Sequence, residues 1–380
     1  MLTRIIMCLH RRHLEKEDRH WTCLFQIRYL FVIFATFWIL CTVVDVILLR
    51  KPIFQQIIPR KEINLSNYLL LWYAPPFWAR NMKPQNGLKN CVFKNCDISL
   101  DKSLLNKSHV LVFHHADLNI NPPIRTENQI WIFMTLESTL HTRGINRKHH
   151  WNNAFNWTWS YRQDSEIFTP YAKLSKRLTL KDKNYTVIFE QKSKDVAWVV
   201  SNCNTHSQRM KYVQMMKKYI NVDIYGRCGK PCSSSGDNCI KKLSSDYKFY
   251  LSFENSLCDD YVTEKAFRLY KDDFNIVPVI RGAPNIKDIL PNGTFISTGD
   301  FNSPKQLALY LRDVASNKTK YLTYIQAKNR YAAHSNIDLI RDGACTLCKI
   351  LNSDNKRKGT VNLSQWAWKN KCVSPSDFTK

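Results

Sequence analysis

Short apolar runs alternate with helix-like stretches through most of the chain after residue 66. Two of these runs, HVLVFH at 109–114 and IWIFMTL at 130–136, predict buried strands. Further along the chain, the expected elements are the strand AWVVS near residue 196, a helix over 208–219, strands at 222–226, 247–253 and 276–280, and a helix from about 263 to 271. Strand–helix alternation in two separate blocks predicts an α/β fold with two domains built on mainly parallel sheets.

Two local signals help to set the boundaries. Ser303 before Pro304 predicts the start of another helix, because Ser caps free N–H groups and Pro suits the first turn. The polar segment 181–194, KDKNYTVIFEQKSK, marks the change between the two blocks. We therefore expect domains at 67–190 and 191–350, followed by a C-terminal tail at 351–380.

The N-terminal region predicts a membrane anchor. Residues 29–49, YLFVIFATFWILCTVVDVILL, hold one charge, at Asp45, and 21 residues are enough to cross a bilayer. The preceding segment of 28 residues is too long for a typical leader, and no small-residue cleavage site follows, so we expect an uncleaved signal-anchor. Residues 1–28 are then a cytoplasmic tail, and 50–66 form a short basic stem.

Cysteines and glycosylation sequons indicate that the bulk of the chain is lumenal. An even number of cysteines beyond the anchor fits a disulfide framework in an oxidising compartment, where nucleic acid is not an expected partner. Cys345-x-x-Cys348 could also be half a zinc site or a redox motif, but no second such pair or His-x-x-x-His accompanies it, which favours disulfides. The ten cysteines are Cys91, Cys96, Cys203, Cys228, Cys232, Cys239, Cys258, Cys345, Cys348 and Cys372, and the seven sequons begin at Asn64, Asn106, Asn156, Asn184, Asn292, Asn317 and Asn362.

Composition restricts how a phosphate could be bound. The 380 residues include 10 glycines, where average usage of about 7% predicts roughly 27. Neither G-x-G-x-x-G nor G-x-x-x-x-G-K-[ST] occurs, so a glycine-rich loop is excluded as the phosphate cradle. Side chains would have to bind the phosphate instead, and the net charge of +25 supplies candidates.

Polar side chains follow several of the expected strands, at the edge where ligands bind in open α/β sheets. After the strand at 247–253 come Glu254 and Asn255, and then a helix start at Thr263-Glu264-Lys265. A helix N-terminus suits an anion, and a lysine in the first turn is unusual without one. A capped surface helix explains the same residues without a ligand, and physics alone does not choose between them.

Two other strand ends carry candidate chemistry. Ser201 and Asn202 follow AWVVS with Arg209 seven residues after Asn202, a pattern that suits a diphosphate or, more simply, a capped helix with a surface arginine. Glu137 follows IWIFMTL and could be a general base in a partly dry cleft or an N-cap. His114-His115 could ligate a metal but is more simply a loop pair, and no D-x-D metal clamp occurs. We therefore expect no metal site.

Four sequence blocks resemble one enzyme family. FENSLCDDYVTEK at 253–265 resembles the signature of the inverting α1,3-fucosyltransferases of the Golgi. The blocks NWTWSYRQDSEIFTPY, VAWVVSNCN and VDIYGRC, at 156–171, 196–204 and 222–228, resemble family blocks in the family order. The resemblance covers nearly the whole lumenal part. It implies a GT-B fold, with two Rossmann-like domains facing a cleft, in which 67–190 binds the acceptor and 191–350 binds GDP-fucose.

The resemblance also implies roles for individual residues. Glu137 matches the catalytic base, and the C-terminal cysteine pair has Cys91 and Cys96 as natural partners. The Pro that relatives often carry soon after the acid is absent from Glu137-Ser138-Thr139, which leaves the acceptor open. The other six lumenal cysteines look like the invertebrate branch, and their pairing is not deducible. The donor-binding positions are Arg209, Tyr261, Glu264 and Lys265, with weaker roles for Asn202, Lys248, Glu254 and Asn255.

The implied reaction is a single displacement, in which Glu137 takes the proton of a GlcNAc O3 as that oxygen attacks C1 of fucose opposite GDP. No cofactor is required, although stimulation by a divalent cation without a recognisable site stays open. The acceptor is an N-acetyllactosamine antenna or the innermost GlcNAc of an N-glycan, and 137–142 leans toward the core-type enzymes. Two alternative functions stay open, a Golgi sulfotransferase and a catalytically silent, membrane-anchored glycan-binding protein. A homodimer through the stem or anchor also stays open.

Overall fold

A computed structural model of the chain describes residue 36 and residues 67–76, 88, 90–118, 121–142, 151, 153–232, 236–272, 274–334, 336–353, 359–368 and 371–378. Several predictions for the N-terminal region lie outside the described residues. These are the tail 1–28, the anchor 29–49 (Thr36 excepted), the stem 50–66 and the sequon at Asn64. Within the described ranges, no helix has both the length and the apolar character needed to cross a membrane. Residues 66–380 form one compact unit.

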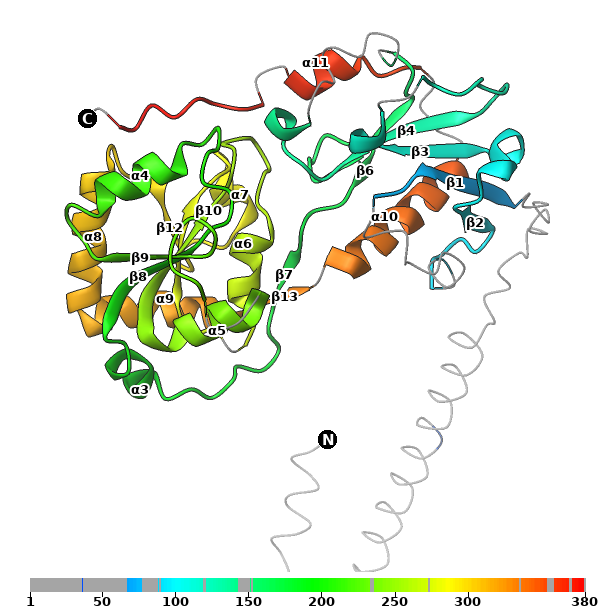
Figure 1. Ribbon diagram of the computed structural model, residues 1–380. Helices are drawn as coiled ribbons and strands as arrows, with labels where there is room; N and C mark the ends of the chain where they lie inside the picture. The colour runs from blue at the N-terminus through cyan, green and yellow to red at the C-terminus, as the bar shows by residue number, and fades with distance from the viewer. Residues whose placement is uncertain are drawn as a thin grey trace, which may run out of the picture. The chain divides into compact units, whose positions relative to one another are not determined.

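The first sheet has, among the described residues, six parallel strands in the order β2–β1–β3–β4–β5–β6 (Figure 1). The strands predicted at 109–114 and 130–136 are confirmed as β3 (Val110–His114) and β4 (Ile130–Thr135). The other four strands are β1 (Tyr68–Ala74), β2 (Cys96–Ser99), β5 (Trp157–Ser160) and β6 (Ile167–Phe168).

Side chains of this sheet alternate between its two faces, as the pleat requires. In β1, β3 and β4, even-numbered residues such as Val112 and Ile132 belong to one buried cluster, and odd-numbered residues such as Leu111 and Phe133 belong to another. Both faces of the central strands are therefore covered. This explains why β3 and β4 are apolar at successive positions and do not alternate with polar residues.

The second sheet has five parallel strands in the order β12–β11–β10–β8–β9 within the described residues. Four of them confirm predicted strands, and β12 was not predicted. Their bounds are β8 (Lys194–Val199), β9 (Val222–Tyr225), β10 (Tyr247–Phe253), β11 (Val277–Arg281) and β12 (Ile296–Ser297).

Helices cover both faces of the second sheet. The predicted helix at 208–219 forms as α4 (Arg209–Met216), which packs with α8 (Pro304–Ser316) on one face, and α5 (Gly236–Asp246) packs on the other. Ser303 Oγ accepts a hydrogen bond from Gln306 N at 3.3 Å, which confirms the predicted helix start. The helix expected over 263–271 is shorter, with α6 (Glu264–Phe267) followed by the 3-10 turn η8 (Arg268–Tyr270).

The remaining described elements are short turns, connections and the C-terminal helices. Two connecting strands, β7 (Lys173–Lys176) and β13 (Tyr331–His334), pair antiparallel. The others are η3 (Lys102–Lys107), η4 (His115–Asp117), η5 (Thr139–His141), α3 (Tyr185–Glu190), α7 (Ile286–Ile289), η9 (Thr298–Asp300), α9 (Lys318–Asn329), α10 (Asn336–Leu351) and α11 (Leu363–Trp368).

Helix α10 differs from the expected domain division. The second domain was expected to extend to residue 350, but α10 packs on the first sheet, where its buried residues join the cluster of Val112 and Ile132 (Figure 1). The physical reason is an apolar stripe on this helix, formed by Ile340, Ala344, Leu347 and Leu351. The chain therefore returns to the first sheet after β13.

The ten cysteines beyond the anchor form five disulfides. Two of them attach α10 to the region around β2, and the other three lie in or next to the second sheet. The pairs are Cys91–Cys345, Cys96–Cys348, Cys203–Cys228, Cys232–Cys239 and Cys258–Cys372. The sequence alone left the last three open, because pairing depends on the spatial contacts of distant loops.

Candidate active site

The carboxyl ends of β4 and β10 carry polar loops that contact each other. The Oγ atoms of Ser138, after β4, and Ser256, after β10, lie 2.7 Å apart in a buried hydrogen bond. Tyr261 OH also donates to Glu137 Oε2 at 3.3 Å. The polar segments predicted after these two strands, one in each domain, thus lie next to each other.

Glu137 is held at this junction by backbone and aromatic contacts. Its backbone N–H donates to Thr135 Oγ1 at 3.1 Å, which turns the chain directly after β4. Tyr171 OH donates to the carbonyl of Leu136. The Glu137 side chain is partly exposed and lines a small pocket with Thr139, Thr142, Arg162 and Trp366 among others. A carboxylate in such a partly exposed position can act as a proton acceptor.

Three tyrosines surround the Glu137 contact. The ring centroid of Tyr261 lies 5.0 Å from that of Tyr161 and 6.3 Å from that of Tyr171. Burial raises the pKa of Tyr261 well above its ordinary value, and the neighbouring Tyr171 and Glu254 add to the effect. Tyr261 therefore stays protonated at neutral pH and donates its hydrogen bond to Glu137.

The start of α6 is organised by a buried carboxylate. Glu254, only 1% exposed, accepts hydrogen bonds from Thr263 N at 2.9 Å, from Thr263 Oγ1 at 2.8 Å and from Lys265 Nζ at 2.9 Å. The anion that compensates the lysine in the first turn is therefore Glu254 itself. Gly282, which directly follows the neighbouring strand β11, permits this packing, since a Cβ there would lie 3.0 Å from the Glu254 Cγ atom.

Lys265 and Glu264 form the more exposed part of the same cluster. Burial opposes the charge on Lys265, but Glu254 and Glu264 outweigh it, so the pKa of Lys265 is raised. Partial burial likewise opposes the charge on Glu264, yet Lys265 and Arg268 lower its pKa below the ordinary value. Both groups are charged at neutral pH, and the Glu264 carboxylate is half-exposed.

Arg209 lies at the carboxyl ends of β8 and β10. Its guanidinium donates to the carbonyls of Phe253 at 2.5 Å and Asn202 at 3.0 Å, and burial lowers its pKa. Among the described residues, Arg209 Nε and Asn255 Oδ1 are buried polar atoms without a hydrogen-bond partner. Such atoms are normally satisfied by a ligand or water, so this region suits the binding of a polar ligand.

Two of the predicted site groups lie elsewhere or have other partners. Lys248 is not brought to this edge, because it stands near the start of β10 with its Nζ 5.2 Å from the centroid of the Phe189 ring. His115 Nδ1 lies 3.1 Å from Thr135 Oγ1. Within the described part of the chain, no cluster of three or more His, Cys, Asp or Glu side chains is arranged to hold a metal ion.

The described sequons differ in their environment. Asn156 is half-buried, and its side chain accepts from Trp131 N at 2.9 Å and donates to the carbonyl of Gly359 at 2.9 Å. The other five described sequon residues are exposed, namely Asn106, Asn184, Asn292, Asn317 and Asn362. Asn184 and Asn317 cap helices α3 and α9.

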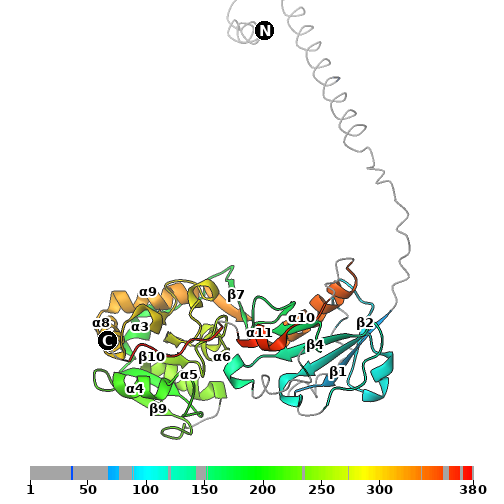
Figure 2. The same ribbon diagram turned by 90° about the horizontal axis from the view of Figure 1, so that it is seen from above.

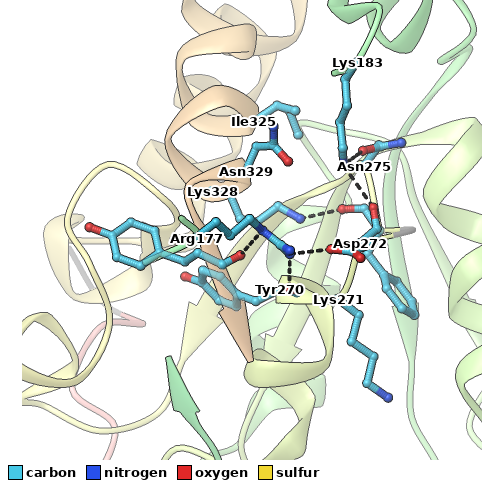
Figure 3. A pocket seen from close by; sticks show the side chains of 11 residues that line it. Arg177, Lys183, Tyr270, Lys271, Asp272, Asn275, Ile325, Lys328 and Asn329 are labelled. Carbon is cyan, nitrogen blue, oxygen red and sulfur yellow. Dashed lines mark hydrogen bonds and ion pairs between the residues drawn. The ribbon is translucent and has the colours of Figure 1, made fainter. Parts of the chain in front are cut away.

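A basic pocket near the end of α9 is distinct from the Glu137 site (Figure 3). Lys328 is buried and donates to the carbonyls of Leu269 and Phe274, and Lys183 donates to Asn275 Oδ1 at 2.7 Å. Arg177 pairs with Asp272. Protein oxygens thus already accept hydrogen bonds from these three basic side chains, and burial lowers the pKa of Lys328 well below its ordinary value.

Several residues of the site were not identified from the sequence. Ser138 and Ser256 were not assigned a role, and neither was Arg281, which is buried beside the start of α4. A serine in a loop or an arginine at the end of a strand has no sequence signal of its own. Tyr161 and Tyr171 do lie in the quoted block 156–171, so their proximity to the site could have been expected.

Comparison with known proteins gives matches across the described unit. The family pattern described as "Glycosyltransferase family 10 (fucosyltransferase) C-term" matches residues 189–366, and "Fucosyltransferase, N-terminal" matches residues 64–172. The human 4-galactosyl-N-acetylglucosaminide 3-alpha-L-fucosyltransferase 9 is 35% identical over 311 residues, 79% of this chain and 82% of that protein. The human 4-galactosyl-N-acetylglucosaminide 3-alpha-L-fucosyltransferase FUT5 is 33% identical over 280 residues, 72% of each chain.

A solved structure is also similar in fold. The crystal structure of an alpha1,3-fucosyltransferase with GDP superposes with a TM-score of 0.51 at 14% identity. The similarity covers 77% of this chain and 92% of that one. At this identity the likeness concerns the fold, and it agrees with the GT-B arrangement of two parallel sheets.

Proposed function

Since the chain belongs to glycosyltransferase family 10, the fucosyltransferases, and is an α1,3-fucosyltransferase, we propose that it transfers fucose from GDP-fucose to O3 of a GlcNAc with inversion at C1. The observation that carries this proposal is the meeting of Glu137 with the donor-side residue Tyr261 at the strand ends. A general base on one side and a basic polar region on the other are the two parts that an inverting transfer needs.

In this proposal, Glu137 accepts the proton of the acceptor O3 as that oxygen attacks C1 of fucose from the face opposite GDP. Lys265 and Arg209 stabilise the charge that develops on the departing diphosphate. Glu264 accepts hydrogen bonds from sugar hydroxyls, which is consistent with its charged, half-exposed carboxylate. Asn202 and Asn255 line the donor region, while Glu254 orients Lys265 by accepting a hydrogen bond from its Nζ atom.

The acceptor is a GlcNAc in a glycoprotein glycan. The relatives with 33–35% identity are named for 4-galactosyl-N-acetylglucosaminide, so an N-acetyllactosamine antenna is the first acceptor that we propose. The innermost GlcNAc of an N-glycan is the second, supported by the segment 137–142 and by the surplus disulfides that resemble the invertebrate branch. An acceptor panel with both glycans separates the two.

We also propose a location for the enzyme. Five disulfides, seven sequons and the apolar segment 29–49 support a single-pass type II protein of the Golgi membrane with a lumenal catalytic part. Association of two copies through the stem or anchor and stimulation by a divalent cation are compatible with this arrangement.

The test is a transfer assay with GDP-fucose on the full chain and on Glu137→Gln. The variant should keep nearly the wild-type KM for GDP-fucose and lose about 100-fold or more in kcat, because a general base is removed. Wild-type turnover in the variant would contradict the role of Glu137. Glycan binding without any GDP release in the wild type would instead favour a catalytically silent binding protein.

A further inference from the structure

The C-terminal segment 371–378, here called the strap, lies along the candidate donor region. It follows α11, on the side of the first sheet, and runs to the elements of the second sheet in both views (Figures 1 and 2). From its sequence, this segment was expected only to form a C-terminal tail. In the structure it contacts two separate segments of the candidate donor region.

One attachment of the strap is to the loop before α6. Cys372 forms a disulfide with Cys258, and the two residues also form an antiparallel β-bridge. Val373 N donates to the carbonyl of Leu257, and Asp259 N donates to the carbonyl of Lys371, both at 2.8 Å. The loop held in this way leads directly into Tyr261 and the start of α6.

The other attachment of the strap is a buried ion pair. Arg281, at the end of β11, is 2% exposed and binds both carboxylate oxygens of Asp377, with 2.9 Å between Nη2 and Oδ1. The Arg281 guanidinium carbon lies 4.2 Å from the ring centroid of Tyr212 and 5.7 Å from that of Phe378. A buried guanidinium without its carboxylate would be strongly unfavourable, so Asp377 keeps Arg281 in place.

Arg281 also holds the backbone turn that precedes Arg209. Its Nε and Nη2 atoms lie 3.4 and 3.3 Å from the carbonyl oxygen of Ser207. Ser207 also donates from its N–H to the carbonyl of Asn255 at 3.0 Å and from Oγ to the carbonyl of Glu254 at 2.7 Å. The next residue, Gln208, has φ of +48°, a conformation that non-glycine residues rarely adopt. Three anchored atoms on Ser207 hold this unusual turn.

We propose that Asp377 is a positioning residue for donor binding, acting through Arg281 and Ser207 on Arg209. The strap links both donor-binding segments, the loop before α6 through Cys372 and the turn before α4 through Asp377. The inference rests on the proposed GDP-fucose function of this site. Neither Asp377 nor Arg281 is assigned a contact with the substrate.

The experiment compares Asp377→Ala, which removes the carboxylate without creating an Asn-x-Thr sequon, with the wild-type full chain in the fucose transfer assay. The variant should raise the KM for GDP-fucose about tenfold or more, which corresponds to about 1.4 kcal/mol or more, while kcat at saturating donor stays within about threefold. The rise in Tm on addition of GDP should shrink in parallel, a readout that does not depend on turnover. Asp377→Glu, which retains the charge, should recover most of the donor affinity.

Two further variants separate positioning from stability. Asp313→Asn is the matched control, because Asp313 pairs with Lys320 in an exposed ion pair on α8 and α9, and it should leave both readouts unchanged. The double variant Arg281→Met with Asp377→Leu removes both charges of the pair and should fold even where Asp377→Ala does not. We expect its KM for GDP-fucose to stay raised, because Ser207 has lost its guanidinium donor.

The outcomes distinguish this inference from the proposed function. A wild-type KM for GDP-fucose in either Asp377→Ala or the folded double variant would overturn the positioning role. A loss of kcat with unchanged donor KM in these variants would overturn it as well. If the wild-type chain neither binds GDP nor transfers fucose, the proposed function fails, and this result is read from the wild type alone.

Discussion

The carboxylate of Glu254 should be the main stabilising group at the start of α6, and Glu254→Gln tests this. In the wild type, the buried carboxylate accepts from Thr263 N, Thr263 Oγ1 and Lys265 Nζ at 2.8 to 2.9 Å. Gln keeps the shape and one acceptor oxygen. Its NH2 group cannot accept from Lys265, so the ammonium group loses its buried partner.

The magnitude follows from these contacts. A hydrogen bond to a charged group contributes about 1.5–3 kcal/mol, and removing one partner of a buried ion pair costs about 3–5 kcal/mol. Since Gln retains part of the network and Lys265 is partly exposed, we expect the free energy of unfolding to fall by about 2–3 kcal/mol. For a domain of 150–250 residues this corresponds to a Tm lower by roughly 5–10 °C. The KM for GDP-fucose should rise as well, because Lys265 is no longer oriented.

The assay is thermal unfolding of the full chain in detergent, followed by tryptophan fluorescence at one scan rate with and without GDP. Glu190→Gln is the control, since Glu190 pairs with Lys318 where both side chains are exposed, and its Tm should change little. If Glu254→Gln unfolds within 1 °C of the wild type and keeps its donor KM, the structural role inferred for Glu254 is wrong.

Three other predictions concern stability and modification. Burial lowers the pKa of Lys192 to about 7, so between pH 7 and about 10 the unfolded chain binds more protons than the folded chain. The Tm of the wild type should therefore rise relative to that of Lys192→Met as the pH increases. A difference in Tm that is the same at pH 7 and 9.5 would contradict this. Replacing Cys345 and Cys348 by Ser removes both ties of α10 and should cost about 2–5 kcal/mol for each disulfide, measured as lost yield and lower Tm, whereas an unchanged Tm would refute it. Peptide mass analysis should find Asn156 unglycosylated and the exposed Asn292 available, because the Asn156 amide is committed to Trp131 N and the Gly359 carbonyl; a glycan on Asn156 would exclude these contacts.

Much of the fold could be predicted because its strands are short apolar runs between polar turns. The apolar run at 247–253 correctly predicted both ends of β10, and Ser303-Pro304 correctly predicted the start of α8. The position of α10 could not be predicted in the same way. Its apolar stripe requires a partner but does not specify one, and the disulfides that select the first sheet join cysteines more than 250 residues apart in sequence.

The site was predictable where the residue type itself limits the chemistry. Glu137 and Lys265 were proposed as candidates because an acidic group at a strand end and a lysine at a helix start need an explanation, whereas Tyr261 was named only through the family resemblance. Lys248 was also predicted for the donor site, but β10 is seven residues long and Lys248 stands at the opposite end of this strand from Glu254 and Asn255. Arg281 stayed unidentified because its partner, Asp377, is 96 residues away.

The scarcity of glycine and the strap have a common physical explanation. A glycine-rich loop presents N–H groups whose positions are fixed by the backbone, but lysine and arginine side chains each carry about 2 kcal/mol of rotamer entropy that must be lost on binding. A donor site built from side chains therefore gains affinity when other residues restrict them beforehand. Glu254 restricts Lys265, and the carbonyls of Phe253 and Asn202 restrict Arg209. The backbone turn before Arg209 depends on Ser207, Arg281 and Asp377. The strap therefore supplies rigidity that a glycine-rich loop would otherwise provide.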